Sequence, residues 1–215
     1  MWRLASKAAG VKAAEEIPHQ APVLSVNEVF RCCAAAATAG DLSLAAVLAL
    51  TWVTCARTGS IVQLRKEDVA VEGNTISVTF RRGKGVRMRQ VAHSVHSDMG
   101  EFSQFITPAL QEGAGFLFPA KSRAERAAIL ASILDLLRQE TGRVEVKNYS
   151  IRRGALQALA LAGMPMSKLL HYSGHATEAM LRTYLGFGRH VKADARTAAE
   201  HVRALVNRTA AEESC

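Results

Sequence analysis

Apolar residues recur at intervals of three and four along much of this chain, a spacing typical of amphipathic helices. The segment 25–40 opens with Ser25 and Glu28 in a capping-box pattern and ends at Gly40. The segment 41–56 is capped by Asp41 and is apolar nearly all round, which predicts a helix central to the core. The segment 122–142 predicts an amphipathic helix that Gly142 ends. Its expected apolar stripe is Ala127, Leu130, Ile133, Leu134 and Leu137.

Between residues 69 and 95 the period of the pattern changes to two. The segments 69–73, 74–80 and 86–95 read as short strands, with turns at 72–74 and 83–85. Consecutive strands joined by tight turns predict a small antiparallel sheet with three strands.

Helical patterns return after the sheet. A short helix is expected within 96–110, followed by helices at 122–142, 151–163, 166–174, 177–186 and about 192–208. The predicted fold class is therefore mainly α with a small antiparallel three-stranded β-sheet, an α+β fold. Two prolines near residue 20 favour a tail or linker over 1–22, before a domain over 23–190. The final segment, 191–215, is expected to hold a helix and a tail. Whether that helix packs on its own domain or on a neighbouring protomer stays open.

The chain carries a net charge of +8, which favours a polyanionic partner, nucleic acid before an anionic membrane surface. No uninterrupted apolar run reaches membrane-spanning length, and no secretory signal is recognisable, so an intracellular protein without a membrane partner is expected. The four cysteines form no C-x-x-C pair. Neither a zinc site nor a disulfide framework is predicted, and no metal or other cofactor is expected.

The candidate chemistry is concentrated between residues 149 and 184. Arg152 opens a helical pattern, His175 follows a glycine, and Tyr184 lies nine residues further on. Arginine binds phosphate oxygens through its planar guanidinium, and histidine can donate a hydrogen bond or a proton. A tyrosine phenol can be a covalent nucleophile where an electropositive site stabilises its anion. Together these residue types indicate phosphate chemistry.

This stretch resembles the catalytic domain of the tyrosine recombinase (phage integrase) family. That family has a His-x-x-Arg box, then Gly-His, then the nucleophilic tyrosine. The counterparts here are 149–152, 174–175 and Tyr184. An earlier arginine box is matched by Arg57, Leu64 and Asp68. The sequence departs from the family pattern at Tyr149, where histidine is usual, and at Ser60, where an acidic residue is common.

The resemblance implies a tyrosine recombinase fold and a role for each matched residue. Arg57 and Arg152 would bind the scissile phosphate, and Tyr184 would attack it to form a 3′-phosphotyrosine. Lys84, at the tip of the second hairpin, would protonate the leaving 5′ hydroxyl. Tyr149 and His175 would hydrogen-bond the phosphate, with Tyr149 giving reduced activity compared with histidine. Arginines expected to contact DNA phosphates are Arg81, Arg82, Arg87, Arg89 and Arg153.

The function that follows is site-specific cleavage and rejoining of double-stranded DNA, for a mobile element, within a synaptic tetramer and with no small-molecule substrate. Two alternatives stay open: a weak or inactive DNA-binding module of the same fold, and relaxation of DNA in the manner of a type IB topoisomerase. Many relatives carry a further helical DNA-clamping domain before the catalytic one. None is recognised here, so a fragment, a domain of a longer polyprotein and a minimal enzyme are all compatible with the sequence.

Overall fold

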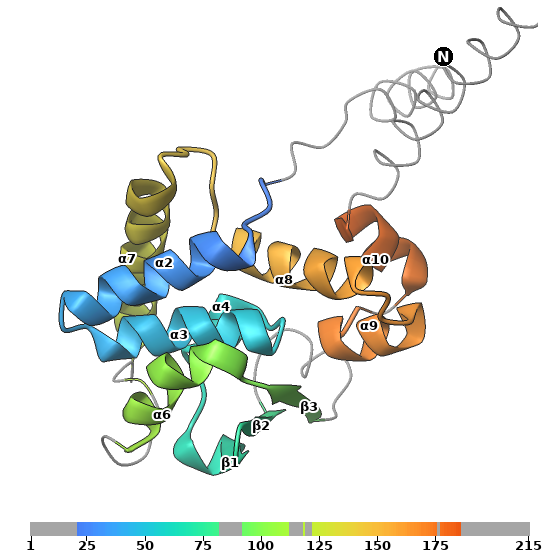
Figure 1. Ribbon diagram of the computed structural model, residues 1–215, viewed down its shortest axis with the longest axis horizontal. Coiled ribbons are helices and arrows are strands. Elements are labelled where there is room, and N and C mark those ends of the chain that lie inside the picture. The colour runs from blue at the N-terminus through green and yellow to red at the C-terminus, as the bar shows by residue number, and fades with distance from the viewer. Residues whose placement is uncertain (1–20, 82–91, 112–117, 119–121, 176, 186–215) are drawn as a thin grey trace, which may run out of the picture.

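The computed structural model of the chain describes residues 21–81, 92–111, 118, 122–175 and 177–185. Within these ranges the fold consists of helices packed around one main core, with a small sheet along one edge (Figure 1). In chain order the elements are α2 (Val26–Thr38), α3 (Leu42–Val53), α4 (Thr58–Ile61), η1 (Lys66–Asp68), β1 (Val69–Glu72), β2 (Thr75–Phe80), β3 (His93–Asp98), η2 (Gly100–Phe102), α6 (Ser103–Gln111), α7 (Arg123–Thr141), α8 (Tyr149–Leu161), α9 (Met166–Ser173) and α10 (Glu178–Leu185).

The first helices form where the sequence predicts them. The Ser25 hydroxyl accepts the Glu28 amide at 3.3 Å, and the Glu28 carboxylate accepts the Ser25 amide at 2.7 Å, so the capping box is complete. Asp41 caps α3 by accepting the amide of Leu44 at 2.8 Å. Most of α3 is buried, from Ala45 to Thr51 without interruption, which confirms its central position.

The sheet is antiparallel with the order β1-β2-β3, as the pattern predicts. Glu72 pairs with Thr75, so the first hairpin turns at Gly73, whose φ of +59° favours glycine. One boundary differs from the prediction. The residues 96–98 were expected in a helix, but they extend β3 because Thr75 pairs with Asp98 and Ser77 with His96. The second hairpin tip, with Lys84, lies outside the described residues.

The long helix α7 begins and ends as expected, between the capping residue Ser122 and Gly142 at φ +66°. Its buried stripe is narrower than predicted. Ile133 and Leu137 are fully buried, whereas Ala127 is exposed and Leu134 is half-buried. Leu130 packs against the core as predicted, and Ile129 and Leu136, which were not predicted, pack there as well.

The helices α8, α9 and α10 form the part of the fold that carries the candidate chemistry. They lie at one end of the molecule, with α9 and α10 packed beside the later turns of α8 (Figure 1). A second apolar cluster holds them together through Ala155 and Leu156 of α8, Leu169 of α9 and Leu181 and Leu185 of α10. The predicted helix at 192–208 lies outside the described residues.

Candidate active site

One pocket brings together residues from both arginine boxes. It lies where the start of α4, the start of α8, the segment after α9 and the end of α10 meet. Its volume of about 400 Å³ is ample for a phosphodiester group. The lining residues are Arg57, Thr58, Gly59, Leu130, Asn148, Tyr149, Arg152, His175 and Tyr184. Five of the six predicted catalytic residues therefore share one site, and the sixth, Lys84, lies outside the described residues.

Arg152 is fixed in the wall of this pocket. It is only 4% exposed, and its guanidinium donates to the carbonyl oxygens of Cys55 at 2.9 Å and of Ser173. Burial lowers the pKa of this guanidinium, and the neighbouring Arg57 charge acts in the same direction. Cys55 adopts a φ of +50°, an uncommon value for a residue with a side chain, at the point where its carbonyl meets Arg152. The arginine is thus oriented by main-chain oxygens before any phosphate binds.

Arg57 lies in a different environment from Arg152. It is exposed and immediately precedes α4, with extended backbone angles. The following residue holds the segment in place, because the Thr58 hydroxyl donates to the carbonyl of Asn148 at 3.0 Å. The backbone of the first arginine box is therefore tied to the start of α8, while the Arg57 side chain lines the pocket from an exposed position.

Further along the first box, Leu64 and Asp68 have structural positions. Leu64 is buried in the core, and the Asp68 carboxylate accepts the Arg65 amide at 3.0 Å. The same carboxylate accepts Arg81 Nε at 2.9 Å. Arg81 nevertheless keeps 55% of its side chain exposed, so its predicted contact with DNA stays a prediction. Arg82, Arg87 and Arg89 lie outside the described residues.

Tyr184 points into the site of its own chain. Its ring centroid lies 5.0 Å from that of His175 and 5.8 Å from Cζ of Arg152. Its hydroxyl donates to the carbonyl of Tyr149 at 3.4 Å, a long bond that is easily exchanged for another partner. Burial raises the pKa of the Tyr184 phenol, while Arg152, Arg153 and Arg57 all act to lower it. The phenol is therefore protonated at neutral pH and surrounded by cations able to stabilise its anion.

His175 and Tyr149 both contact Tyr184, His175 through its ring and Tyr149 through its main-chain carbonyl. His175 follows Gly174, which ends α9 in the left-handed conformation at φ +58°. The amide of His175 donates to the Ser173 hydroxyl at 3.3 Å, which fixes the turn. Tyr149 is the first residue of α8 and is 42% exposed, so its phenol lies at the entrance of the pocket.

The structure separates Tyr184 from the rival tyrosine at position 172. The Tyr172 hydroxyl donates to the main-chain carbonyl of His96, and its ring packs against both apolar clusters. Tyr172 does not line the pocket. Its interpretation as a packing residue agrees with this placement.

Arg153 occupies a position that the sequence did not indicate. It was predicted to contact DNA, yet it is 7% exposed and donates to the carbonyl oxygens of Tyr184, at 2.9 Å, and of Ala21. These bonds direct its guanidinium into the protein and favour a structural role. Sequence reasoning also missed Asn148, whose side-chain nitrogen donates to the carbonyl of Leu130 at 2.9 Å at the pocket wall. Its place directly before the Tyr149 box was the available signal.

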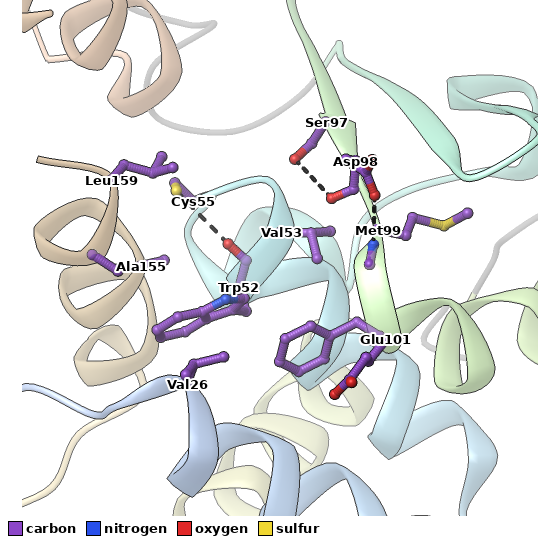
Figure 2. A pocket seen from close by; sticks show the side chains of 13 residues that line it. Val26, Trp52, Val53, Cys55, Ser97, Asp98, Met99, Glu101, Ala155 and Leu159 are labelled. Carbon is purple, nitrogen blue, oxygen red and sulfur yellow. Dashed lines mark hydrogen bonds between the residues drawn. The ribbon is translucent and has the colours of Figure 1, made fainter. Parts of the chain in front are cut away.

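A second pocket, which shares no lining residue with the first, has a different character (Figure 2). It is mainly apolar, and Trp52, Phe102 and Leu159 contribute large side chains to it. Cys55 lies between the two pockets. Its side chain lines the second pocket and contacts the Trp52 carbonyl at 3.7 Å (Figure 2). Its own carbonyl accepts a hydrogen bond from Arg152. The second pocket contains none of the predicted site residues.

The described residues hold neither a metal-binding cluster nor a membrane-spanning helix. In that part of the chain, no group of three or more histidine, cysteine, aspartate or glutamate side chains is arranged to share a metal ion. Among its helices, none has the length and apolar character needed to cross a membrane.

Comparison with solved structures shows the same fold in recombinases. The XerA recombinase has a TM-score of 0.59 at 20% identity, over 78% of this chain and 60% of that chain. The XerH site-specific recombinase, bound to palindromic difH substrate in a post-cleavage complex, has a TM-score of 0.64 at 13% identity, over 84% and 54%. The Tn1549 transposon integrase in complex with transposon right end DNA has a TM-score of 0.52 at 15% identity, over 75% and 60%.

This chain thus spans little more than half the length of these proteins. No curated protein matches the sequence. A family model does match, however, and its matched region of residues 22–187 contains both arginine boxes, Gly174-His175 and Tyr184. The predicted fold is confirmed, and the chain belongs to the phage integrase family.

Proposed function

We propose that this chain cleaves and rejoins DNA strands in site-specific recombination, with Tyr184 as the covalent nucleophile. The observation that carries the proposal is the shared pocket of Arg57, Arg152, His175 and Tyr184, which come from distant parts of the sequence. Membership of the phage integrase family supports the same reaction class.

The first requirement of the reaction is to hold the scissile phosphate and neutralise its developing charge. Arg152 meets it from a fixed position, because two carbonyl oxygens already orient its guanidinium. Arg57 closes on the phosphate from the exposed side of the pocket. His175 and the Tyr149 phenol supply further hydrogen bonds to the phosphate oxygens.

The second requirement is an in-line nucleophile. The Tyr184 oxygen attacks phosphorus, a phosphotyrosine bond forms, and the bond to the 5′ oxygen breaks. The phenol proton is lost to His175 or solvent, and the leaving oxygen takes a proton, for which Lys84 is the proposed donor. Rejoining reverses these steps when a 5′ hydroxyl attacks the phosphotyrosine.

The placement of Tyr184 supports cleavage in cis, by the tyrosine of the same protomer that holds the phosphate. Its ring lies within 5.0 Å of the His175 ring of its own chain, and its helix packs on α8 and α9. Mixing Tyr184→Phe protein with Arg152→Ala protein tests this point. Cis cleavage predicts no product from the mixture, whereas trans cleavage would restore it.

The proposed partner is double-stranded DNA, bound by a homo-oligomer that reaches a tetramer when two sites are joined. The net charge of +8 suits a polyanion. Binding is expected to weaken steeply as salt rises, and a flat response would argue against DNA as the partner.

The direct experiment is covalent trapping on nicked duplexes with a randomised core. Cleavage beside the nick releases a short strand and leaves the protein on DNA, and sequencing of the trapped strands identifies the target. The parent protein is expected to give a DNA-linked band that survives denaturation, and Tyr184→Phe to give none. Bound DNA without any covalent band would overturn the proposal.

One observation favours a second candidate function, a DNA-binding module with weak or absent catalysis. Tyr149 lies at the pocket entrance where the family usually has histidine, and a phenol is a poorer proton acceptor near neutral pH. The trapping assay separates this candidate from the first. Relaxation of supercoiled plasmid without a target sequence would instead indicate a topoisomerase-like activity.

A further inference from the structure

Arg153 connects two segments that lie far apart in the sequence. Its Nε–H donates to the Tyr184 carbonyl at 2.9 Å, and its Nη1 donates to the carbonyl of Ala21. The side chain is 7% exposed. One buried guanidinium therefore holds the main chain of the proposed nucleophile against the segment by which the described chain enters the domain.

The end of α10 needs partners of this kind. The last four carbonyls of a helix have no hydrogen-bond donor within the helix and require donors from elsewhere. The carbonyl of Tyr184 is bound by Arg153, and the carbonyl of Leu185 accepts Gln157 Nε2. Arg153 and Gln157 are four residues apart on α8, so they lie on the same face of that helix. Together they cap the short helix that carries the tyrosine.

The entry segment is itself held firmly against α8. Ala21 is 3% exposed and Leu24 is fully buried. Gly154 permits this contact, since a Cβ atom there would lie 1.9 Å from the Leu24 carbonyl oxygen. Arg143 adds a hydrogen bond to the Val23 carbonyl at 3.4 Å. Ala21 is thus a fixed anchor, and Arg153 transmits its position to Tyr184.

We propose that Arg153 is a positioning residue for the nucleophile, which holds Tyr184 in place for in-line attack by bridging the Ala21 and Tyr184 carbonyls. The proposal rests on the proposed function of Tyr184. A displacement of about 1 Å in a reacting group can reduce a rate about 100-fold, so the hold on a helix of eight residues matters for chemistry. The entry segment and the active site become mechanically linked through this one side chain.

The test compares three variants of the full chain: Arg153→Gln, Arg153→Lys and the control Arg143→Gln. The control loosens the same entry segment but has no bond to α10, since Arg143 binds Val23 and Glu28. Lysine keeps the charge of Arg153 and can donate to one carbonyl, so it is the conservative variant if glutamine prevents folding.

The first readout is amide hydrogen exchange without DNA. Arg153→Gln is expected to speed exchange in 178–185 while α7 stays protected, and Arg143→Gln is expected to leave 178–185 unchanged. The second readout is single-turnover cleavage at saturating DNA. We expect a loss of about 100-fold for Arg153→Gln and about tenfold for Arg153→Lys, with unchanged DNA affinity and salt dependence.

Three results would overturn the proposal. If Arg153→Gln and Arg143→Gln speed hydrogen exchange in 178–185 equally, Arg153 contributes only to the general stability of the fold. Weaker DNA binding with a smaller salt slope in Arg153→Gln, which removes the charge, would make Arg153 a phosphate contact. Unchanged exchange in 178–185 would show that Tyr184 is held without it. If the parent forms no covalent product, the proposed function fails, and hydrogen exchange still decides whether Arg153 holds α10.

Discussion

The two sides of the candidate active site differ in how their side chains are held. We call Arg152 and its neighbour Arg153 the buried wall, and Arg57 and Tyr149 the exposed rim. The arginines of the wall are 4% and 7% exposed and donate to main-chain carbonyls, whereas Tyr149 is 42% exposed. A side chain already oriented loses little freedom when the phosphate binds, while one on the rim must be ordered at that moment. Substitutions in the wall should therefore reduce both catalysis and the stability of the fold, whereas substitutions in the rim should change catalysis alone.

The largest contrast is expected between Arg152→Ala and Arg57→Ala. Each removes a cation from the phosphate site, so each should reduce single-turnover cleavage by about 10²–10³-fold. Arg152→Ala should also lower the free energy of unfolding by about 2 kcal/mol, because it leaves the carbonyls of Cys55 and Ser173 without their donor.

Cleavage assays and urea denaturation of the two variants measure these effects. Arg57→Ala is expected to unfold at the same urea concentration as the parent. Equal stability losses in both variants would abolish the distinction between wall and rim.

A second test concerns the packing behind the wall. A Cβ atom at Gly154 would lie 1.9 Å from the Leu24 carbonyl oxygen and 3.1 Å from the Trp52 ring. Gly154→Ala should therefore reduce the free energy of unfolding by about 3 kcal/mol. Gly59→Ala is the matched control, since nothing lies within 4 Å of a Cβ there. A small loss of unfolding free energy in Gly154→Ala would show that the segment around Leu24 shifts easily to make room for the added Cβ atom.

The rim offers a prediction of increased activity. Tyr149→His introduces an imidazole at the pocket entrance, a better proton acceptor near neutral pH than a phenol. We expect cleavage to rise about tenfold, less than a full general acid–base effect because the phenol already supplies a hydrogen bond, with no change in stability. Tyr149→Phe, which lacks the hydroxyl, serves as the comparison. A decrease with histidine would mean that the phenol has its own role at this position.

The smallest effect is expected from acid, at the ion pair between Glu28 and Arg143. Burial raises the pKa of Glu28, but hydrogen bonds from Ser25 and the charges of Arg143 and Arg31 outweigh it and leave that pKa below 4.5. A lowered pKa stabilises the fold above the unfolded value of 4.5, and this contribution disappears as pH falls through the folded value. Thermal denaturation between about pH 5 and 3 should therefore show a shallower loss of stability in Glu28→Gln. Parallel curves would contradict this.

Much of the fold was predictable because its signals are local. The Ser25–Glu28 capping box, Asp41 and Gly142 mark helix ends through contacts within a few residues. The error at 96–98 has a tertiary cause, since the pairing of β3 with β2, and not any periodicity in His-Ser-Asp, makes these residues a strand.

The residues of the candidate site also divide into those that the sequence predicted and those that depend on tertiary contacts. The resemblance to the tyrosine recombinase pattern, matched in order and spacing, identified Arg57, Arg152, His175 and Tyr184, which share the pocket. The adjacent arginines Arg152 and Arg153 look alike in sequence, and only the contacts with Ser173, Tyr184 and Ala21 distinguish their roles. Asn148 was missed for the same reason, because its contact with Leu130 depends on the packing of α7 near α8.

The central claim is that Tyr184 is the residue that becomes bonded to DNA. Its most direct test is peptide mapping of the trapped complex, after nuclease digestion, by mass spectrometry. The chain has three tyrosines, so the attached nucleotide can be assigned to one of them. We predict that it is found on the peptide containing Tyr184. A nucleotide on Tyr149 or Tyr172 would contradict the account.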